Sequence, residues 1–339
     1  MRRLYLMRHG RPDVPLGTRR CLGRTDLPLG ALGRMQACRT ALGMAGLSFE
    51  AVYASPLRRA VETAGFFSKE VRVLPELREI DCGDWDGLDF EEIQRRWPEV
   101  YAARGRDLSL PMPNGESADA VRERAGRALR QILSETTGDV LIVTHSFVIR
   151  SLLNDFGVRL PYASLTIPGE PDAVGLVPEV PLTPGLADVL LTAAAPGAEI
   201  EAHCRAVEKE ARRIADALPL ALDAELLSAA ALLHDVARAE PEHAKTGARW
   251  LRELGYDEAS WIVAQHHDHS GAVLNEGAIL YLADKCVLAD QVVPLAERFE
   301  KSESRCLTEE AKDAHARRLA AAERLRDEIN DLCQSEVVR

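Results

Sequence analysis

Short apolar runs alternate with amphipathic stretches along the first half of the chain. The runs are rich in Val, Ile, Leu and Tyr, and they predict strands buried on both faces at 4–7, 49–55 and 140–145. Helical spacing of apolar positions predicts the helices between them, at 30–45, 56–67, 89–102 and 117–135. Because strands and helices alternate, we expect an α/β domain in which helices cover a sheet.

The pattern changes after residue 160. Residues 165–188 are rich in proline and glycine, which predicts a linker that starts with a last strand or two of the first domain. Beyond 185 the pattern indicates no strand and predicts helices at about 199–217, 224–236, 243–254, 257–267, 275–290 and 308–333. We therefore predict a first domain over 1–180 and an all-α second domain over 185–339.

The last predicted helix, 308–333, is highly charged and keeps apolar positions at helical spacing. This pattern is typical of a solvated surface helix or of a helix that forms a dimer. A homodimer is thus one expectation for the chain, and a direct functional role for this helix is the less favoured reading.

Composition narrows the class of protein. The net charge of −11 argues against a general nucleic-acid binder, which usually has a basic surface. Seven scattered cysteines without a CxxC pair indicate a reduced protein rather than a disulfide scaffold. The first apolar run stops at Arg8, too early for a signal peptide, and no stretch reaches the roughly 18 apolar residues of a membrane helix. We expect a soluble, cytoplasmic protein that binds neither duplex nucleic acid nor a membrane.

Two histidines stand at the ends of predicted strands in the first half. His9 follows "LYLM" and Arg8, and His145 closes "VLIVT" in the same way. In open α/β sheets ligands bind at the carboxyl ends of the strands, so these imidazoles are expected to face one pocket. Ser55 and Pro56 predict the start of a helix whose first turn holds Arg58 and Arg59. Convergent guanidinium and imidazole groups predict a phosphate site, because the arginine fork matches phosphate oxygens.

Five ordered motifs then carry a specific resemblance: "LMRHG", "SPLRRAVETA", "ELREIDCGDWDG", "NGES" and "VTHS". Together they resemble the histidine phosphatase superfamily, with its phosphoglycerate mutase-like three-layer α/β fold, over about residues 3 to 160. The resemblance implies that His9 is the nucleophile that becomes phosphohistidine and that Glu79 is the proton donor. It also implies phosphate binding by Arg8, Arg59 and His145, and contact of Arg24 and Thr25 with the substrate or its phosphate. No cofactor is expected in this domain.

Some positions depart from the family pattern. Cys82 stands where an aromatic residue is usual, and Asp86 stands where glutamate is frequent. Arg11-Pro12 also replaces the polar residue that commonly follows the motif. The stretch 83–113 is short compared with the substrate lid of glycolytic mutases. A less covered site admits water, which favours a phosphatase, with a mutase-type phosphotransferase as the alternative. The spacing and loops resemble the small-metabolite phosphatases, including α-ribazole phosphatase-like members.

The second half contains seven of the nine histidines, at 203, 234, 243, 266, 267, 269 and 315. His234-Asp235 ends an apolar helix, and such a charged pair at a buried end needs a partner. Imidazole and carboxylate groups drawn from several helices suit Mn, Fe, Zn or Mg. Lys285 is expected to pair with Asp284 or with substrate phosphate.

The order H…HD…H…H…D over about 198–300 resembles the HD-domain metal phosphohydrolases. The resemblance implies a metal held by His203, His234, Asp235 and Asp284. His243 and His266 match positions that bring in a second ion in some members, notably those that resemble diadenosine tetraphosphate hydrolases. His267 and His269 are expected to be pocket or surface residues. One or two divalent ions would activate water for attack on a phosphate ester.

The favoured hypothesis is a bifunctional enzyme that acts on small phosphorylated metabolites or nucleotides. One half would be a phosphomonoesterase with a phosphohistidine intermediate, and the other a metal-dependent hydrolase of a nucleotide-like phosphate ester. The alternative from a different class is a phosphatase whose HD half binds a nucleotide without catalysis and regulates the first half.

Overall fold

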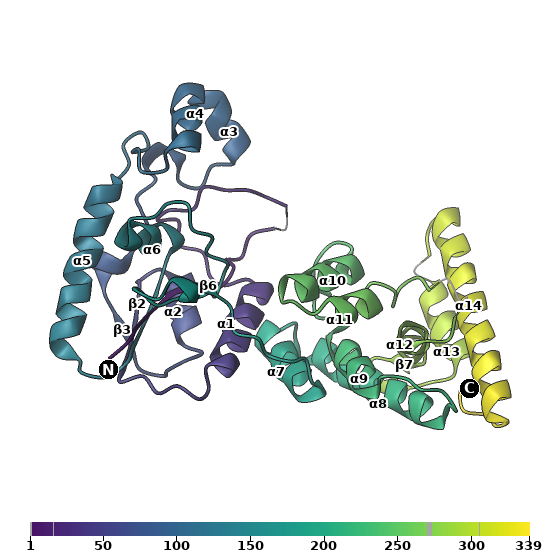
Figure 1. Cartoon of the computed structure of the whole chain (residues 1–339). Helices are drawn as coiled ribbons and strands as arrows, with labels where there is room; N and C mark the ends of the chain where they lie inside the picture. The colour runs from purple at the N-terminus through teal and green to yellow at the C-terminus, as the bar shows by residue number, and fades with distance from the viewer. Residues whose placement is uncertain (1, 16, 270–272, 305) are drawn as a thin grey trace. The chain divides into compact units, whose positions relative to one another are not determined.

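The computed structural model describes residues 2–15, 17–269, 273–304 and 306–339. The chain divides into two compact units, Met1–Val180 and Pro181–Arg339. The first is an α/β domain and the second is helical apart from one short hairpin (Figure 1). The expected architecture of an α/β domain followed by a helical domain is confirmed.

A six-stranded sheet forms the centre of the first unit, in the order β3-β2-β4-β1-β5-β6. The first four strands in that order are parallel, whereas β5 runs antiparallel to β1, and β6 antiparallel to β5. The strand bounds are β1 Leu4–Arg8, β2 Ala51–Ala54, β3 Val71–Val73, β4 Val140–Thr144, β5 Leu165–Thr166 and β6 Val174–Leu176. Because β1 and β4 are parallel neighbours, His9 and His145 follow adjacent strand ends.

Helices cover both faces of this sheet. Alternate side chains of each strand point to opposite faces. Tyr5 and Met7 pack with residues of α2 and with Met44, which follows α1, whereas Leu6 packs with Ile132 of α5 and Ile149 of α6. The helices of the unit are α1 Ala31–Gly43, α2 Arg58–Ala64, α3 Phe90–Arg96, α4 Pro98–Arg106, α5 Ala118–Glu135 and α6 Ser146–Leu153, with short 3-10 turns at Pro75–Leu77, Gly83–Trp85 and Pro171–Ala173.

Two helix predictions for this unit were wrong in their bounds, and two short elements were missed. The helix predicted over 56–67 begins at Arg58, because the Ser55 hydroxyl accepts a hydrogen bond from the Leu57 N–H and bonds the His145 ring instead of capping a helix. The helix predicted over 89–102 is two helices that meet at Trp97, where Pro98 starts the second. Strand β3 and helix α6 were not predicted, because three and eight residues are too short for a clear period.

Gly10 is needed for close packing rather than for a left-handed turn. A Cβ on this residue would lie 2.4 Å from the carbonyl oxygen of Gly33 in α1, and its N–H donates to the Thr63 hydroxyl of α2. The glycine therefore lets the segment after His9 press against both helices of one layer.

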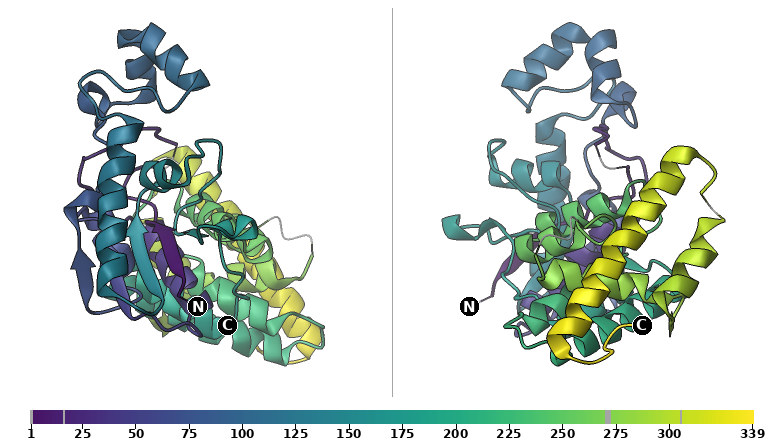
Figure 2. Two further views of the ribbon diagram at one scale, coloured as in Figure 1. Left: turned by 60° about the vertical axis from the view of Figure 1, so that its left-hand side comes forward. Right: turned by 90° about the vertical axis from the view of Figure 1, so that its right-hand side faces the viewer.

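The second unit packs its helices around two that are buried on all sides. Every residue from Leu227 to Leu233 in α9 and from Gly277 to Lys285 in α12 is buried. The helices are α7 Pro184–Ala194, α8 Ala198–Ala217, α9 Ala224–Leu233, α10 His243–Glu253, α11 Asp257–Val263, α12 Glu276–Lys285, α13 Leu295–Glu303 and α14 Glu309–Cys333. Figure 2 shows α14 in yellow as the long C-terminal helix.

Here too the sequence prediction needs correction. Helix α7 occupies part of the stretch predicted as linker, capped by the Thr183 hydroxyl and begun by Pro184. A hairpin of β7 Val287–Leu288 and β8 Gln291–Val292 lies where no strand was expected, and α13 was not predicted. Of the apolar positions of α14, Ala321, Ala322, Leu325 and Ile329 are buried within the chain, whereas Leu332 is exposed.

No helix in the described part of the chain is both long and apolar enough to cross a membrane.

Candidate active sites

His9 lies at the end of β1, buried to 5% exposure. Its Nδ1 lies 2.6 Å from the carbonyl oxygen of Gly10, which only accepts hydrogen bonds, so Nδ1 carries the proton and Nε2 keeps its lone pair. Burial, with the Arg59 and Arg8 cations nearby, lowers the pKa of His9 well below its usual value. The imidazole is therefore neutral near pH 7, the form in which Nε2 is a nucleophile.

Arg59 is the most buried cation at this site, at 1% exposure on α2. Its Nε donates to His9 Nε2 at 3.2 Å, and its other nitrogens donate to the carbonyl oxygens of Thr25 and Gly23. The loop that supplies these carbonyls is held in turn by Asp86, whose carboxylate accepts from the N–H groups of residues 23–25 and from the Thr25 hydroxyl. Asp86 thus positions Arg59 through this loop.

Arg8 and His145 are the other guanidinium and imidazole groups of the site. Arg8 stacks on the Tyr162 ring at 3.8 Å, and the ring centroids of His9 and His145 are 5.0 Å apart. Burial and the neighbouring His9 lower the pKa of His145 well below its usual value. Arg8 Nε and His145 Nδ1 are buried and have no hydrogen-bond partner among the described residues. An oxyanion with several acceptor oxygens, such as phosphate, fits these donors.

Glu79 lies beside the same residues, and burial raises the pKa of its carboxyl group against the opposing effect of the Ile80 N–H and Arg59. Its oxygens approach the N–H groups of Ile80 at 3.0 Å and Phe147 at 3.5 Å. Glu79 also lines, with Arg8, a cavity of about 460 Å³. The raised pKa favours a neutral acid that can give a proton to a leaving oxygen.

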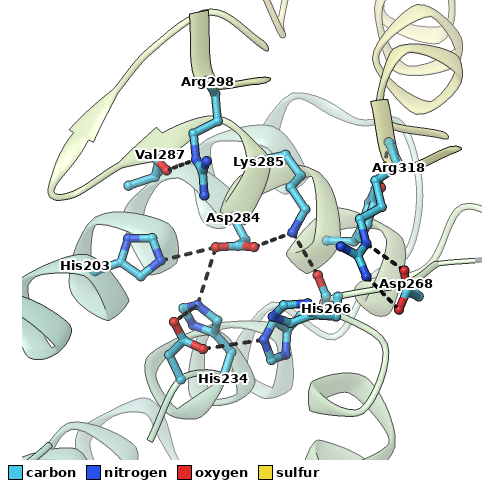
Figure 3. Close-up of polar contacts among 12 residues, drawn as sticks. His203, His234, His266, Asp268, Asp284, Lys285, Val287, Arg298 and Arg318 are labelled. Atoms are coloured by element: carbon cyan, nitrogen blue, oxygen red, sulfur yellow. Dashed lines mark hydrogen bonds and ion pairs between the residues drawn. The ribbon is translucent and has the colours of Figure 1, made fainter. Parts of the chain in front are cut away.

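In the second unit, His203, His234 and Asp284 come together from three helix regions (Figure 3). His203 Nε2 lies 3.1 Å from Asp284 Oδ1, and His234 Nε2 lies 3.7 Å from the same oxygen. Lys285 pairs with the other oxygen at 2.6 Å. Burial opposes ionisation of Asp284, but Lys285 and His203 hold its pKa well below the usual range. The carboxylate is thus charged and available as a ligand.

His243, His266 and His267 form a second group nearby. His267 Nε2 lies 2.8 Å from His243 Nε2. Asp235 lies between the two groups: one oxygen is 3.8 Å from His234 Nε2, and the other is 3.2 Å from His243 Nε2 and 3.5 Å from His266 Nε2. This carboxylate can therefore serve both groups at once.

The histidine tautomers fit metal binding. The Nδ1 atoms of His203, His234 and His266 each approach a backbone carbonyl oxygen at 2.7–2.8 Å. Each Nδ1 therefore carries the proton, and each Nε2 lone pair faces the carboxylates. Asp235 Oδ1 and the Nε2 atoms of His234 and His266 are buried without a hydrogen-bond partner among the described residues. Buried acceptors that face one another repel unless a cation lies between them, so the donor set fits one or two divalent ions.

A cavity of about 790 Å³ opens on this cluster and is lined by several cations. They are Arg238, Lys285, Arg298 and Lys301, and the cavity also reaches His203, Asp235, His266 and Asp284. Lys285 also donates to the His266 carbonyl oxygen, and Arg298 to that of Val287 (Figure 3). Glu199 and Asp290 add carboxylates to the lining, and the four cations beside the metal-ligand groups suit a substrate with several phosphate groups.

Residues 4–167 match the family model of the histidine phosphatase superfamily, branch 1. A Bacillus subtilis protein described as the uncharacterized phosphatase PhoE is 30% identical over 161 residues, which span 46% of this chain and 77% of that protein. The chain belongs to the histidine phosphatase superfamily. Residues 200–289 match the HD domain model, so a histidine phosphatase domain is fused to an HD domain.

The chain is also similar to a second curated protein and to a solved structure. The bifunctional protein Rv2228c of Mycobacterium tuberculosis is 36% identical over 157 residues, or 44% of this chain and 43% of that protein, so the match spans less than half of that relative. The solved structure of Bacillus stearothermophilus YhfR is 29% identical, with a TM-score of 0.47 over 53% of this chain and 98% of that one. With its histidine phosphatase and HD phosphohydrolase domains, the protein is a phosphatase.

Within the histidine phosphatase domain, the structure brings His9, Arg59, His145, Arg8 and Glu79 together. Arg24 and Thr25 belong to the loop that holds Arg59: Arg24 pairs with Asp81 at 2.9 Å, and the Thr25 hydroxyl donates to Asp86. Arg58, the neighbour of Arg59, is exposed and pairs with Glu62.

Sequence reasoning missed three residues of these sites. Tyr162 stacks on Arg8, but nothing in its local sequence distinguishes it. Ser55 bonds His145 at 2.7 Å, although it was predicted only as a helix cap. His267 lines the cavity, as expected of a pocket residue, but its place in the second histidine group of the HD domain was not predicted. The run of three histidines at 266, 267 and 269 was the available signal.

Proposed function

We propose that the protein is a bifunctional phosphohydrolase. Its histidine phosphatase domain is a phosphomonoesterase that acts on a small phosphorylated metabolite through a phosphohistidine on His9. The HD domain hydrolyses a nucleotide-like phosphate ester with one or two divalent ions. The observation that carries the first activity is a buried His9 whose unprotonated Nε2 accepts a hydrogen bond from the buried Arg59, beside a Glu79 carboxyl group whose pKa is raised by burial.

The chain's residues divide the phosphatase chemistry between them. His9 Nε2 attacks the phosphorus atom, and the P–O bond to the alcohol breaks as the N–P bond forms. Arg8, Arg59 and His145 hold the equatorial oxygens, on which charge is spread in the transition state. Glu79 gives its proton to the departing alkoxide and then, as a carboxylate, takes a proton from the water that cleaves the N–P bond.

The pH dependence of this activity follows from the two shifted groups. Glu79 must be protonated to act as the acid, and its pKa is raised. As the pH increases, kcat/KM should therefore stay high beyond the pH at which an ordinary glutamate loses its proton, and should then fall about tenfold per pH unit. His9 must be neutral to attack, and its pKa is lowered well below the usual value. Protonation of His9 should therefore cause no fall in kcat/KM at about pH 6 to 7, where an ordinary histidine titrates. A pH profile of kcat/KM for phenyl phosphate tests both expectations, the alkaline fall from Glu79 and the absence of an acid fall from His9.

Glu79→Gln provides the control for that profile, because substrate ionisation is common to both proteins. The variant should be slower and should lose the alkaline limb. If the alkaline limb persisted unchanged in Glu79→Gln, another group would be the acid.

In the HD domain, His203, His234, Asp235 and Asp284 would hold one ion, and Asp235, His243, His266 and His267 would complete a site for a second. When bound, such divalent ions act as Lewis acids that polarise phosphoryl oxygens and activate water. The cations of the adjacent cavity would bind further phosphate groups, and Lys285 orients Asp284 through their 2.6 Å ion pair. The feature that supports the metal requirement is the set of buried, unpartnered Nε2 and carboxylate atoms.

Chelation separates the two proposed activities in the full-length protein. After EDTA treatment, hydrolysis of a dinucleoside polyphosphate should fall to background and should return when Mn²⁺, Fe²⁺, Zn²⁺ or Mg²⁺ is added back. Hydrolysis of phenyl phosphate in the same sample should be unchanged. Loss of both activities would contradict a metal-free phosphatase site, and persistence of the nucleotide activity would contradict a metal-dependent HD site.

A further inference from the structure

Helices α3 and α4 form a small cap at one end of the phosphatase domain (Figures 1 and 2). Beneath this cap lies the cavity of about 460 Å³ that begins at Arg8 and Glu79. Its walls carry aromatic and apolar side chains, among them Trp85, Phe90, Tyr101, Leu108, Met112 and Phe147. Since Glu79 would protonate the leaving oxygen, this is the place for the alcohol part of the substrate.

The charged residues that line this cavity are mostly positive. Among the described residues that line it, Glu79 has the only carboxyl group, and its raised pKa favours the neutral form. Besides Arg8, three more arginines line the cavity: Arg19, Arg104 and Arg150. The cavity is thus cationic in a chain whose net charge is −11.

Arg104 is the unusual member of this set. It lies in α4 with 7% of its surface exposed, and its Nη1 is buried without a hydrogen-bond partner among the described residues. Its guanidinium lies 5.9 Å from the ring centroids of both Trp85 and Phe147. Asp107 is close enough to act on Arg104 electrostatically, but its carboxylate accepts hydrogen bonds from the Ser109 N–H and hydroxyl. A buried guanidinium without an anion carries a large desolvation cost, and a bound anion offsets it.

Trp85 supplies a second donor of the same kind. Its ring packs at 3% exposure against Trp97 and Tyr101, and its Nε1 is also buried without a partner among the residues that the structure describes. Buried tryptophan N–H groups usually have an acceptor. Two unpartnered donors, one of them charged, therefore line a single cavity beside the proposed acid.

We propose that the substrate is a phosphomonoester whose alcohol part combines an apolar or aromatic ring system with a second anionic oxygen group. The ring system would pack among the aromatic side chains, and Arg104 with the Trp85 N–H would bind the second anion. This proposal rests on the proposed phosphatase function and adds a specificity-determining residue to it. The hydrogen bond from the charged Arg104 guanidinium to this anion is charge-assisted, and burial excludes water from it. Such a bond favours selectivity between substrates rather than a general gain in rate.

The test compares paired substrates that differ only in a carboxylate opposite the ester: phenyl with 4-carboxyphenyl phosphate, and 2-naphthyl with 6-carboxy-2-naphthyl phosphate. We expect the full-length protein to prefer the carboxylate in at least one pair, by about tenfold or more in kcat/KM. Arg104→Met should lower that preference about tenfold, and Arg104→Lys should retain part of it. Because each preference is a ratio within one sample, partial unfolding of a variant cancels.

Arg106→Met is the matched control, since Arg106 is an exposed arginine on the same helix and should keep the wild-type preference. Equal kcat/KM values within both pairs, or a preference that survives in Arg104→Met, would overturn this inference and leave the phosphatase function standing. If no ester were hydrolysed in a His9-dependent manner, the proposed phosphatase function would fail, and this inference with it.

Discussion

Replacement of His9 by alanine should lower kcat for phosphomonoesters by about four orders of magnitude or more, because no other group at the site can form the covalent intermediate. The nearest second imidazole, His145, is 5.0 Å away between ring centroids and is hydrogen-bonded to Ser55. Steady-state turnover of phenyl phosphate measures the loss. Hydrolysis of a nucleotide by the HD domain of the same protein should be unchanged.

Two controls exclude a trivial loss of structure in that experiment. Binding of inorganic phosphate to His9→Ala reports whether Arg8, Arg59 and His145 are still assembled. Arg58→Met changes an exposed arginine next to Arg59 and should keep wild-type activity. Wild-type turnover by His9→Ala, in a protein that still binds phosphate, would exclude His9 as the nucleophile.

Replacement of Asp235 by asparagine should abolish the HD activity, with a fall of at least about 100-fold in kcat/KM. The reason is its place between the two histidine groups, with one oxygen toward His234 and the other toward His243 and His266. The substitution keeps the shape of the side chain but removes the charge that a divalent ion requires. Metal content per chain, measured by plasma mass spectrometry, should fall together with the activity.

Asp268→Asn is the matched control for that substitution. Asp268 is an exposed aspartate next to His267, but its carboxylate pairs with Arg318 at 2.7 Å and lies outside both metal-ligand groups (Figure 3). Its variant should keep both metal content and activity. Full metal content in Asp235→Asn would contradict a bridging role for Asp235. The activity of the histidine phosphatase domain should be unchanged in both variants.

Much of the fold could be predicted from local pattern. The buried strands β1, β2 and β4 are continuous apolar runs, and the long helices α5, α8 and α14 have apolar positions at helical spacing, so their existence could be predicted from the sequence. Short elements could not be found in this way. Strand β3, with three residues, and the β7–β8 hairpin exist because neighbouring backbone pairs with them, which is a tertiary effect that no local period encodes.

The candidate sites show the same division between local and tertiary information. His9 and Arg59 could be proposed because they stand in recognisable motifs. Tyr162 and Arg104 stand in no motif, and their importance arises only from what surrounds them once the chain is folded. Ser55 illustrates a third case: a favourable capping residue was predicted to start a helix, but a hydrogen bond to His145 takes its hydroxyl.

The central claim is that His9 accepts the phosphoryl group on one particular nitrogen. Nδ1 donates to the Gly10 carbonyl oxygen, so the phosphate should be attached to Nε2. Rapid quenching of the full-length protein with a ³²P-labelled phosphomonoester, followed by peptide mapping and assignment of the phosphohistidine isomer, tests this directly. We expect alkali-stable, acid-labile label on Nε2 of His9. Label on Nδ1, on another residue, or on no residue during demonstrated turnover would contradict it.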